Sequence, residues 1–254
     1  MGDFSKYFFN KTEIPKRYGY FKTAFVFSHD VWFDIFLSMA DSHVEFGTYK
    51  YMKSFEVKYK GHNILMCNFG YGFCDLNRVV AEASVLGVKN IIYLNFSLPL
   101  KPDSTVKDKD LYVINASVRN EEATFIEVDE SYPAAAHPCV VRSLREAAKA
   151  LGFTLKPLKS IVIDGFYEKK IKRFTLIDEA LQSDVELKDC DSAPMLVFAS
   201  ARDIRSAILT CVGLKPNLTD MHGELSDFSH YNDKMTLMAK TALDACVLAE
   251  EKYS

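Results

Sequence analysis

Hydrophobic and polar positions along the chain follow two periods in turn. Unbroken apolar runs or strict alternation indicate strands, and a period near 3.6 residues indicates helices. The runs predict strands at residues 23–27, 55–59, 64–67, 90–94, 111–114, 160–163 and 208–212. Helical spacing predicts helices at residues 30–40, 75–86, 137–151 and 191–201, and a last one that Asn232 can cap. The glycine-containing turn at residues 60–62 predicts that the strands on either side of it form a β-hairpin.

This alternation of strands and helices from end to end predicts an α/β fold. Helices that follow strands in this way cover both faces of a sheet, so we expect a three-layer α/β/α domain. The hairpin makes part of the central sheet antiparallel, which predicts a mixed sheet. A chain of 254 residues without repeats, linkers or low-complexity stretches fits one large domain better than two small ones. Residues 1–254 are therefore expected to form a single domain.

Charge and composition exclude several classes of partner. The formal net charge of −3 gives no general attraction to nucleic acid, and the basic run at residues 169–173 is expected to be a solvated surface. No stretch approaches the roughly 20 apolar residues that span a bilayer, and the N-terminus does not resemble a secretory signal. The six cysteines are scattered without a CxxC pair, as expected for reduced thiols. We therefore expect a cytoplasmic protein that binds neither membrane nor nucleic acid.

Short motifs for cofactors and metals are weak or missing. Residues 69–72 (FGYG) match half of a dinucleotide fingerprint, but the third glycine is absent, and so is the Walker lysine pattern. Gly70 and Gly72 are expected to serve the backbone conformation instead. The six histidines show no metal-ligand spacing, and no GxSxG nucleophile elbow is present. The sequence predicts no metal and no cofactor.

A series of short segments, read in order, resembles a known enzyme family. These segments are residues 53–61, 69–72, 86–92, 115–119, 132–134, 164–167, 189–193 and 242–253. They are similar to the nucleoside phosphorylases of the purine and uridine types, and most of all to the hexameric purine type of protist parasites. The resemblance covers roughly residues 20 to 254. It implies the nucleoside-phosphorylase fold and a cleft that binds phosphate, ribose and base, in which phosphate cleaves the N-glycosidic bond.

The same resemblance assigns phosphate binding to positions at which this chain has other residues. Phosphorolysis needs fixed cationic and hydroxyl donors for the attacking anion. At the family's phosphate positions this chain has Ser28 for a loop glycine, Trp32 and Tyr93 for two arginines, Phe96 for a hydroxyl, Asn95 and Leu98 for two glycines, and Lys50 for an arginine donated by the neighbouring subunit. Lys50 alone keeps the charge. Aromatic rings where a dianion should lie predict weak or no phosphorolysis.

The nucleoside positions are partly retained. The family's Glu-Met-Glu, which holds the ribose hydroxyls, corresponds to Asp189, Cys190 and Asp191, and Asp191 keeps the charge on a shorter side chain. Phe166 and Tyr167 correspond to the base-binding segment, although the residues after them do not match the uridine type. Gly213 stands where the purine type has the aspartate that protonates the base. This leaves Asp164 and Asp191 as candidate catalytic groups, and a turn or cap residue is the alternative for Asp164.

The sequence therefore favours a nucleoside-phosphorylase-like protein with degenerate phosphate and acid positions. Such a protein would bind a nucleoside or a small aromatic ligand, or act as an assembly partner. It would form a homo-oligomer (dimer or hexamer) or a hetero-oligomer with an active paralogue. The alternative is an active enzyme that cleaves the N-glycosidic bond of a purine nucleoside or uridine. It would be a phosphorylase, and only then would phosphate be a co-substrate, or a hydrolase that uses Asp164, Asp189 or Asp191.

Two alternatives for the aromatic rings stay open from the sequence. Trp32, Tyr93 and Phe96 are core residues if the chain is an unrelated α/β protein. If the alignment is shifted, Arg78 or Arg119 serves the phosphate instead.

Overall fold

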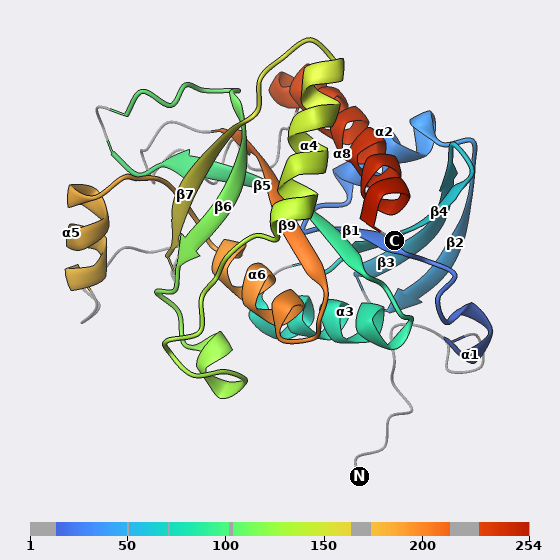
Figure 1. Cartoon of the computed structure of the whole chain (residues 1–254), viewed down its shortest axis with the longest axis horizontal. Coiled ribbons are helices and arrows are strands. Elements are labelled where there is room, and N and C mark those ends of the chain that lie inside the picture. The colour runs from blue at the N-terminus through green and yellow to red at the C-terminus, as the bar shows by residue number, and fades with distance from the viewer. Residues whose placement is uncertain are drawn as a thin grey trace.

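The computed structural model of the chain describes residues 14–49, 51–70, 72–101, 104–163, 174–213 and 229–253 (Figure 1). The strands are β1 (Thr23–Phe27), β2 (Ser42–Tyr49), β3 (Met52–Tyr59), β4 (His62–Asn68), β5 (Asn90–Pro99), β6 (Leu111–Val118), β7 (Lys156–Val162), β8 (Val185–Asp189) and β9 (Arg205–Val212). The helices are α1 (Ile14–Arg17), α2 (Val31–Met39), α3 (Phe73–Val85), α4 (Pro138–Ala150), α5 (Phe174–Gln182), α6 (Ser192–Ser200) and α8 (Asn232–Tyr253). Two short 3-10 turns, η1 (Ala123–Ile126) and η2 (Ser229–Tyr231), complete the described elements.

The strands form one mixed sheet, as predicted, in the order β2-β3-β4-β1-β5-β8-β7-β6-β9. β1 runs parallel to both β4 and β5, while β2, β3 and β4 form antiparallel hairpins. β5 is long enough to pair with two further strands: it runs parallel to β9 over residues 90–97 and antiparallel to β8 at residues 98–99. The additional β5–β9 pairing closes the last five strands into a ring.

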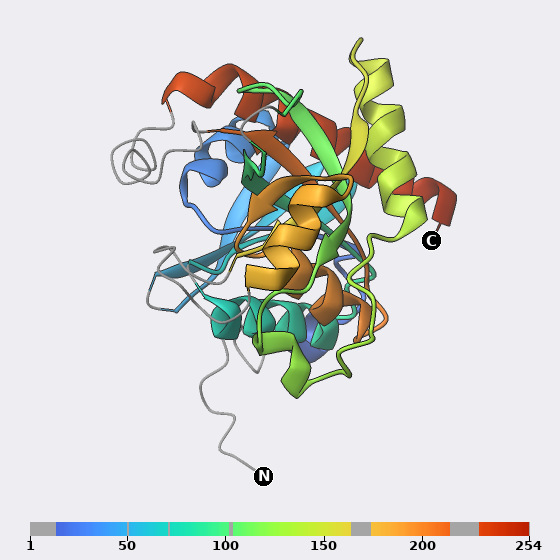
Figure 2. The same cartoon turned by 90° about the vertical axis from the view of Figure 1, so that its left-hand side faces the viewer.

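Helices cover both faces of the sheet, which confirms the expected three layers. α3 and α6 pack together on one face, and α2, α4 and α8 pack on the other (Figures 1 and 2). The core divides in the same way. Ile91 and Tyr93 belong to the cluster under α3 and α6, whereas Ile92 and Leu94 belong to the cluster under α2, α4 and α8. This is the alternation that a strand buried on both faces must show.

The elements that the sequence pattern missed are the short or exposed ones. α1, β2, β8 and α5 were not predicted. β2 is an edge strand with exposed residues and a register shift between Glu45 and Gly47, so it lacks a buried apolar face. β5 and β6 extend beyond their predicted apolar runs because their later residues still pair with neighbouring strands. Asn232 is the first residue of α8 itself and follows directly on η2.

The glycines after β4 have the backbone role that the sequence predicts. Gly70 and Gly72 both have positive φ angles, of 70° and 104°. The ring of Tyr51 lies where a Cβ of residue 70 would be, so a larger residue there would collide as well as be strained. This exit leads the chain from β4 into α3. Among the described residues, no helix combines the length and apolar character needed to cross a membrane.

Candidate functional site

The candidate site lies at the end of the sheet where its parallel strands have their carboxyl ends. β1, β5 and β9 are parallel, so their carboxyl ends meet at the same edge. Ser28 directly follows β1, Phe96 lies near the end of β5, and Gly213 directly follows β9. Ligands of open α/β sheets bind at such carboxyl edges. The topology therefore brings together three of the positions that the sequence singled out.

Tyr93 and Asp191 form the polar centre of this site. Tyr93 lies on β5 and is fully buried, and its hydroxyl donates to Oδ2 of Asp191 at 3.0 Å. Asp191 lies between the end of β8 and the start of α6 and is partly exposed. The resemblance assigns these two positions to phosphate and to ribose, and the structure joins them by a hydrogen bond.

Asp189 has a structural role at the start of α6. Its carboxylate accepts from the backbone N–H of Asp191 at 3.1 Å, from that of Ser192 at 2.8 Å, and from the Ser192 hydroxyl at 2.7 Å. These bonds satisfy N–H groups that the first turn of a helix leaves free. Burial raises the pKa of Asp189, and the hydrogen bonds from Ser192 and Asp191 oppose that shift. Asp189 thus fixes the loop that carries Asp191, and its own oxygens are already engaged.

Asp191 is the titratable group of the site. Burial, and then the nearby charge of Asp189, raise its pKa from 3.8 to about 7, although the hydrogen bond from Tyr93 lowers it. Burial and the same two carboxylates hold the pKa of Tyr93 well above its usual range. At neutral pH the Asp191 carboxyl can therefore both take up and release a proton.

Trp32 and Phe96 lie on the opposite face of the sheet from Tyr93. Trp32, at the start of α2, is 0% exposed, and its ring centroid lies 5.8 Å from that of Phe96. It also lies 6.5 Å from the ring of Phe27 and 6.3 Å from that of Phe36. Separations in this range are those of packed aromatic pairs. The three rings at the phosphate positions therefore do not line one wall: two are packed together, and the third is bonded to a carboxylate.

Gly213 faces a fourth ring, that of Tyr231. A Cβ at residue 213 would lie 3.2 Å from both Cζ and Oη of Tyr231. The Tyr231 ring also lies 5.6 Å from the ring of Phe96, and its hydroxyl is 3.4 Å from Oδ1 of Asp108. The space that an aspartate at 213 would use for its side chain is therefore occupied by Tyr231.

The basic residues proposed for a shifted alignment have other partners. Arg119 donates from Nη1 to the carbonyl oxygens of Asp129, Glu130 and Tyr132, and from Nε and Nη2 to Thr124. Its guanidinium also stacks on Phe125. These contacts hold the loop after β6. Arg78 on α3 pairs with Glu82 one turn later, at 3.0 Å.

Two further groups of basic character lie near the loop after β1. Burial lowers the pKa of His29, and the nearby charge of Asp30 opposes that shift. Lys53 on β3 pairs with Asp30 at 3.2 Å, and Asp30 also accepts from the side chain of Asn68. The cation beside this loop is therefore compensated by a carboxylate of the same loop.

Asn95 adds a buried amide to the polar centre. It is 7% exposed and lies on the same face of β5 as Tyr93. Its Oδ1 accepts from the backbone N–H of Phe96 at 2.8 Å and lies 3.4 Å from the Tyr93 hydroxyl. Its Nδ2 has no hydrogen-bond partner among the residues that the structure describes.

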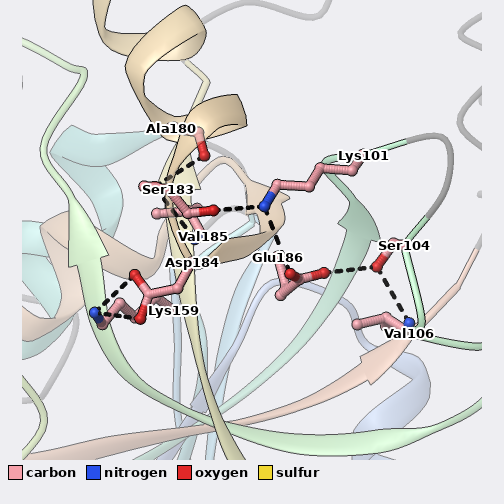
Figure 3. A network of polar contacts seen from close by, with 9 residues as sticks. All are labelled: Lys101, Ser104, Val106, Lys159, Ala180, Ser183, Asp184, Val185 and Glu186. Atoms are coloured by element: carbon pink, nitrogen blue, oxygen red, sulfur yellow. Dashed lines mark hydrogen bonds and ion pairs between the residues drawn. The ribbon is translucent and has the colours of Figure 1, made fainter.

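A polar network links the segment after β5 to the start of β8 (Figure 3). Lys101, which follows β5, donates to the carbonyl oxygen of Ser183 at 2.5 Å and pairs with Glu186 at 3.6 Å. Glu186 also accepts from the Ser104 hydroxyl at 2.8 Å. β8 pairs with β5 at residues 98–99, so these contacts add side-chain links to that backbone pairing.

The remaining predicted residues are placed only in part. Ser28 and Cys190 are half-buried. Lys50, Asp164, Phe166 and Tyr167 lie outside the described residues. Tyr231 and the Asp30–Lys53 pair were not found from the sequence. No motif marks Tyr231, because its contact with Gly213 depends on where α8 begins.

Comparison with known proteins places this chain in a family. The family model described as the phosphorylase superfamily matches residues 38–250. A purine nucleoside phosphorylase of Plasmodium vivax is 25% identical over 215 residues, which cover 85% of this chain and 86% of that protein. A uridine phosphorylase of Salmonella typhimurium is 23% identical over 186 residues, 69% of this chain and 73% of that protein.

Solved structures show the same fold. The purine nucleoside phosphorylase of Toxoplasma gondii, in complex with immucillin-H, superposes with a TM-score of 0.79 at 22% identity, covering 93% of this chain and 94% of that one. The uridine phosphorylase of Vibrio fischeri gives a TM-score of 0.77 at 16% identity, covering 91% and 93%. The resemblance to purine and uridine phosphorylases seen in the sequence is confirmed. This chain belongs to the phosphorylase superfamily.

Proposed function

We propose that this protein binds a nucleoside at the Tyr93–Asp191 site and does not carry out phosphorolysis. The retained carboxylate of Asp191 supports nucleoside binding, because carboxylates accept hydrogen bonds from sugar hydroxyls. The relatives named purine and uridine phosphorylases make a nucleoside the ligand class to test first. A small flat aromatic ligand is the other class that such a site suits.

The observation that best supports the proposed absence of phosphorolysis is the packing of Trp32 against Phe96. These side chains stand at two family positions for phosphate ligands, and both contribute rings to the core instead of donors. A charge-assisted hydrogen bond contributes about 1.5–3 kcal/mol, and the loss of one oxyanion donor slows catalysis roughly 10²–10³-fold. Several such donors are replaced here at once. Desolvation of a phosphate dianion would then be left without compensation.

The charges around the site also disfavour the binding of a phosphate dianion. Tyr93, at the position of an arginine, donates to the Asp191 carboxylate, so this pair adds no positive charge. Arg119 and Lys53 are engaged with the protein's own oxygens. The carboxylates of Asp189 and Asp191 lie close enough to interact electrostatically. A dianion near them would meet repulsion, whereas a neutral nucleoside would not.

Assembly belongs to the same proposal. The resemblance implies sites that are completed by a neighbouring subunit, and it assigns Lys50 to such a shared position. β2 is an edge strand and carries Val44, which is 54% exposed, as an apolar residue for a contact. A dimer, a hexamer or a mixed oligomer with an active paralogue would cover this edge. The six free cysteines suit a reducing cytoplasmic setting.

The test is to incubate the purified protein with inosine, adenosine and uridine, each with and without phosphate, and to measure base release and binding. We expect calorimetric binding of at least one nucleoside and no phosphate-dependent release of base. Phosphate-dependent release at a rate typical of phosphorylases would overturn the proposal. A purine nucleoside phosphorylase assayed in parallel shows that the assay detects turnover.

A nucleoside hydrolase is the second candidate, and the raised pKa of Asp191, to about 7, favours it. In that reaction the oxygen of water bonds to the anomeric carbon, and the Asp191 carboxylate takes a proton from the water. The C–N bond breaks, its electron pair leaves with the base, and the proton that Asp191 took from the water passes to the base. Base release without phosphate that is lost in Asp191→Asn would establish this activity.

A further inference from the structure

The amide of Asn95 is oriented by its own backbone neighbour. An amide side chain offers one acceptor oxygen and one donor nitrogen. Because the N–H of Phe96 donates to one end at 2.8 Å, that end must be the oxygen. The opposite orientation would set two donors against each other. The NH₂ group therefore points away from the strand backbone, and its direction does not depend on the ligand.

This NH₂ group is buried without a partner. Asn95 is 7% exposed, and no acceptor among the described residues reaches Nδ2. A buried donor left unsatisfied costs about 1–3 kcal/mol, so most such groups have a partner. The resemblance puts a glycine at this position, which has no side chain to satisfy. At this position the chain therefore has a side-chain donor, whereas the glycine that the resemblance implies has none.

The position of Asn95 shows which ligand atoms it can meet. The Tyr93 hydroxyl lies 3.0 Å from Oδ2 of Asp191 and 3.4 Å from Oδ1 of Asn95, so one phenol oxygen lies beside both side chains. The same amide group carries Nδ2, a donor without a partner among the described residues, and the Asp191 carboxylate is an acceptor. A group that accepts one hydrogen bond and donates another satisfies both. Hydroxyl groups have this capacity, whereas a phosphate dianion only accepts.

We propose that Asn95 is a specificity-determining residue that donates from Nδ2 to a sugar hydroxyl of the bound nucleoside, while the same hydroxyl donates to Asp191. This inference rests on the proposed function, because it takes the ligand to be a nucleoside. It adds a contact that a glycine at this position cannot make. The contact selects for a hydroxylated sugar and compensates for the buried amide.

The experiment compares the binding of inosine and uridine with that of their 2′-deoxy and 3′-deoxy counterparts, by calorimetry. The variants are Asn95→Asp, which keeps the oxygen that accepts from Phe96, and Asn95→Ala, which tests the contact if the first does not fold. We expect each to bind the ribonucleoside about tenfold more weakly. The affinity of the variants for at least one deoxy counterpart should change much less. The ribose preference, which is the affinity for the ribonucleoside divided by that for its deoxy counterpart, should therefore be smaller in the variants than in wild type.

Asn90→Ala is the matched control. Asn90 lies at the other end of β5, is 2% exposed and also has a side-chain atom without a partner among the described residues. Its replacement should lower stability without altering the ribose preference. An unchanged preference in both Asn95 variants, with wild-type nucleoside binding intact, would overturn the inference and leave the proposed function standing. If the wild-type protein binds none of these nucleosides, the proposed function and this inference fail together.

Discussion

At the scale of single residues, Asp191 lies where its negative charge costs stability. Its carboxyl is surrounded by protein and close to the carboxylate of Asp189, and both effects favour the protonated form. The Tyr93 hydroxyl offers partial compensation at 3.0 Å. Carboxyl groups with a raised pKa cluster at functional sites. A ligand that donates a hydrogen bond to Asp191 would stabilise its ionised form.

Replacement of Asp191 by asparagine should make stability less dependent on pH. The folded pKa of about 7 lies above the ordinary value of 3.8. Between these two values the folded state holds a proton that the unfolded state has released, so wild-type stability falls as pH rises from 4 to 7. The asparagine side chain cannot ionise but can still accept from Tyr93. The variant should therefore gain on the order of a few kcal/mol over wild type between pH 5 and pH 8.

Urea unfolding at pH 5 and pH 8 measures this difference. Asp34→Asn, an exposed carboxyl on α2, is the control and should leave the pH dependence of wild type unchanged. If Asp191→Asn and wild type lost the same stability between the two pH values, Asp191 would not be the group that titrates.

At the scale of elements, the carboxyl end of β9 meets the start of α8. Gly213 follows β9, and Tyr231 is the last residue of η2, which leads into α8. The Tyr231 side chain lies on the side of Gly213 where a Cβ atom would be. Such a Cβ would be 3.2 Å from Cζ and Oη of Tyr231, so glycine fits there. The two elements thus require a small residue at 213 for as long as Tyr231 keeps its place.

Gly213→Ala should therefore destabilise the protein by about 1–3 kcal/mol, the usual cost of forcing extra volume into a packed core. Tyr231→Leu removes the nearest ring atoms and should make the same substitution at 213 nearly neutral. Chemical unfolding of the two single variants and the double variant measures the coupling. Strict additivity of the two effects would show that the ring does not determine the residue at 213.

The elements that could be predicted from the sequence are those with a regular buried face. Residues 23–27 were predicted to both ends because every one of them is buried in β1. The hairpin of β3 and β4 followed from its alternating and apolar runs and the glycine turn at Gly61. β2 and β8 could not be found in this way. β2 is largely exposed. β8 alternates between buried and half-buried positions, but it is only five residues long and three of them are charged, so it has no apolar run.

At the scale of the whole molecule, the sheet separates two groups of residues that the sequence had assigned to one cleft. Alternation along β5 puts Tyr93 under α3 and α6, and Phe96 under α2 and α8, close to Trp32. The sequence pattern did not predict this separation. The contacts that decide it join residues far apart in the chain, such as Tyr93 to Asp191 and Phe96 to Tyr231.

The central claim is that this chain retains a nucleoside site and has lost the phosphate site beside it. The most direct measurement is a crystal structure of the protein soaked with inosine, adenosine or uridine together with phosphate. The predicted result is a nucleoside whose sugar contacts Asp191, with Trp32 and Phe96 still packed together and no phosphate bound between the sugar and β5. A phosphate held there by basic side chains would contradict the account.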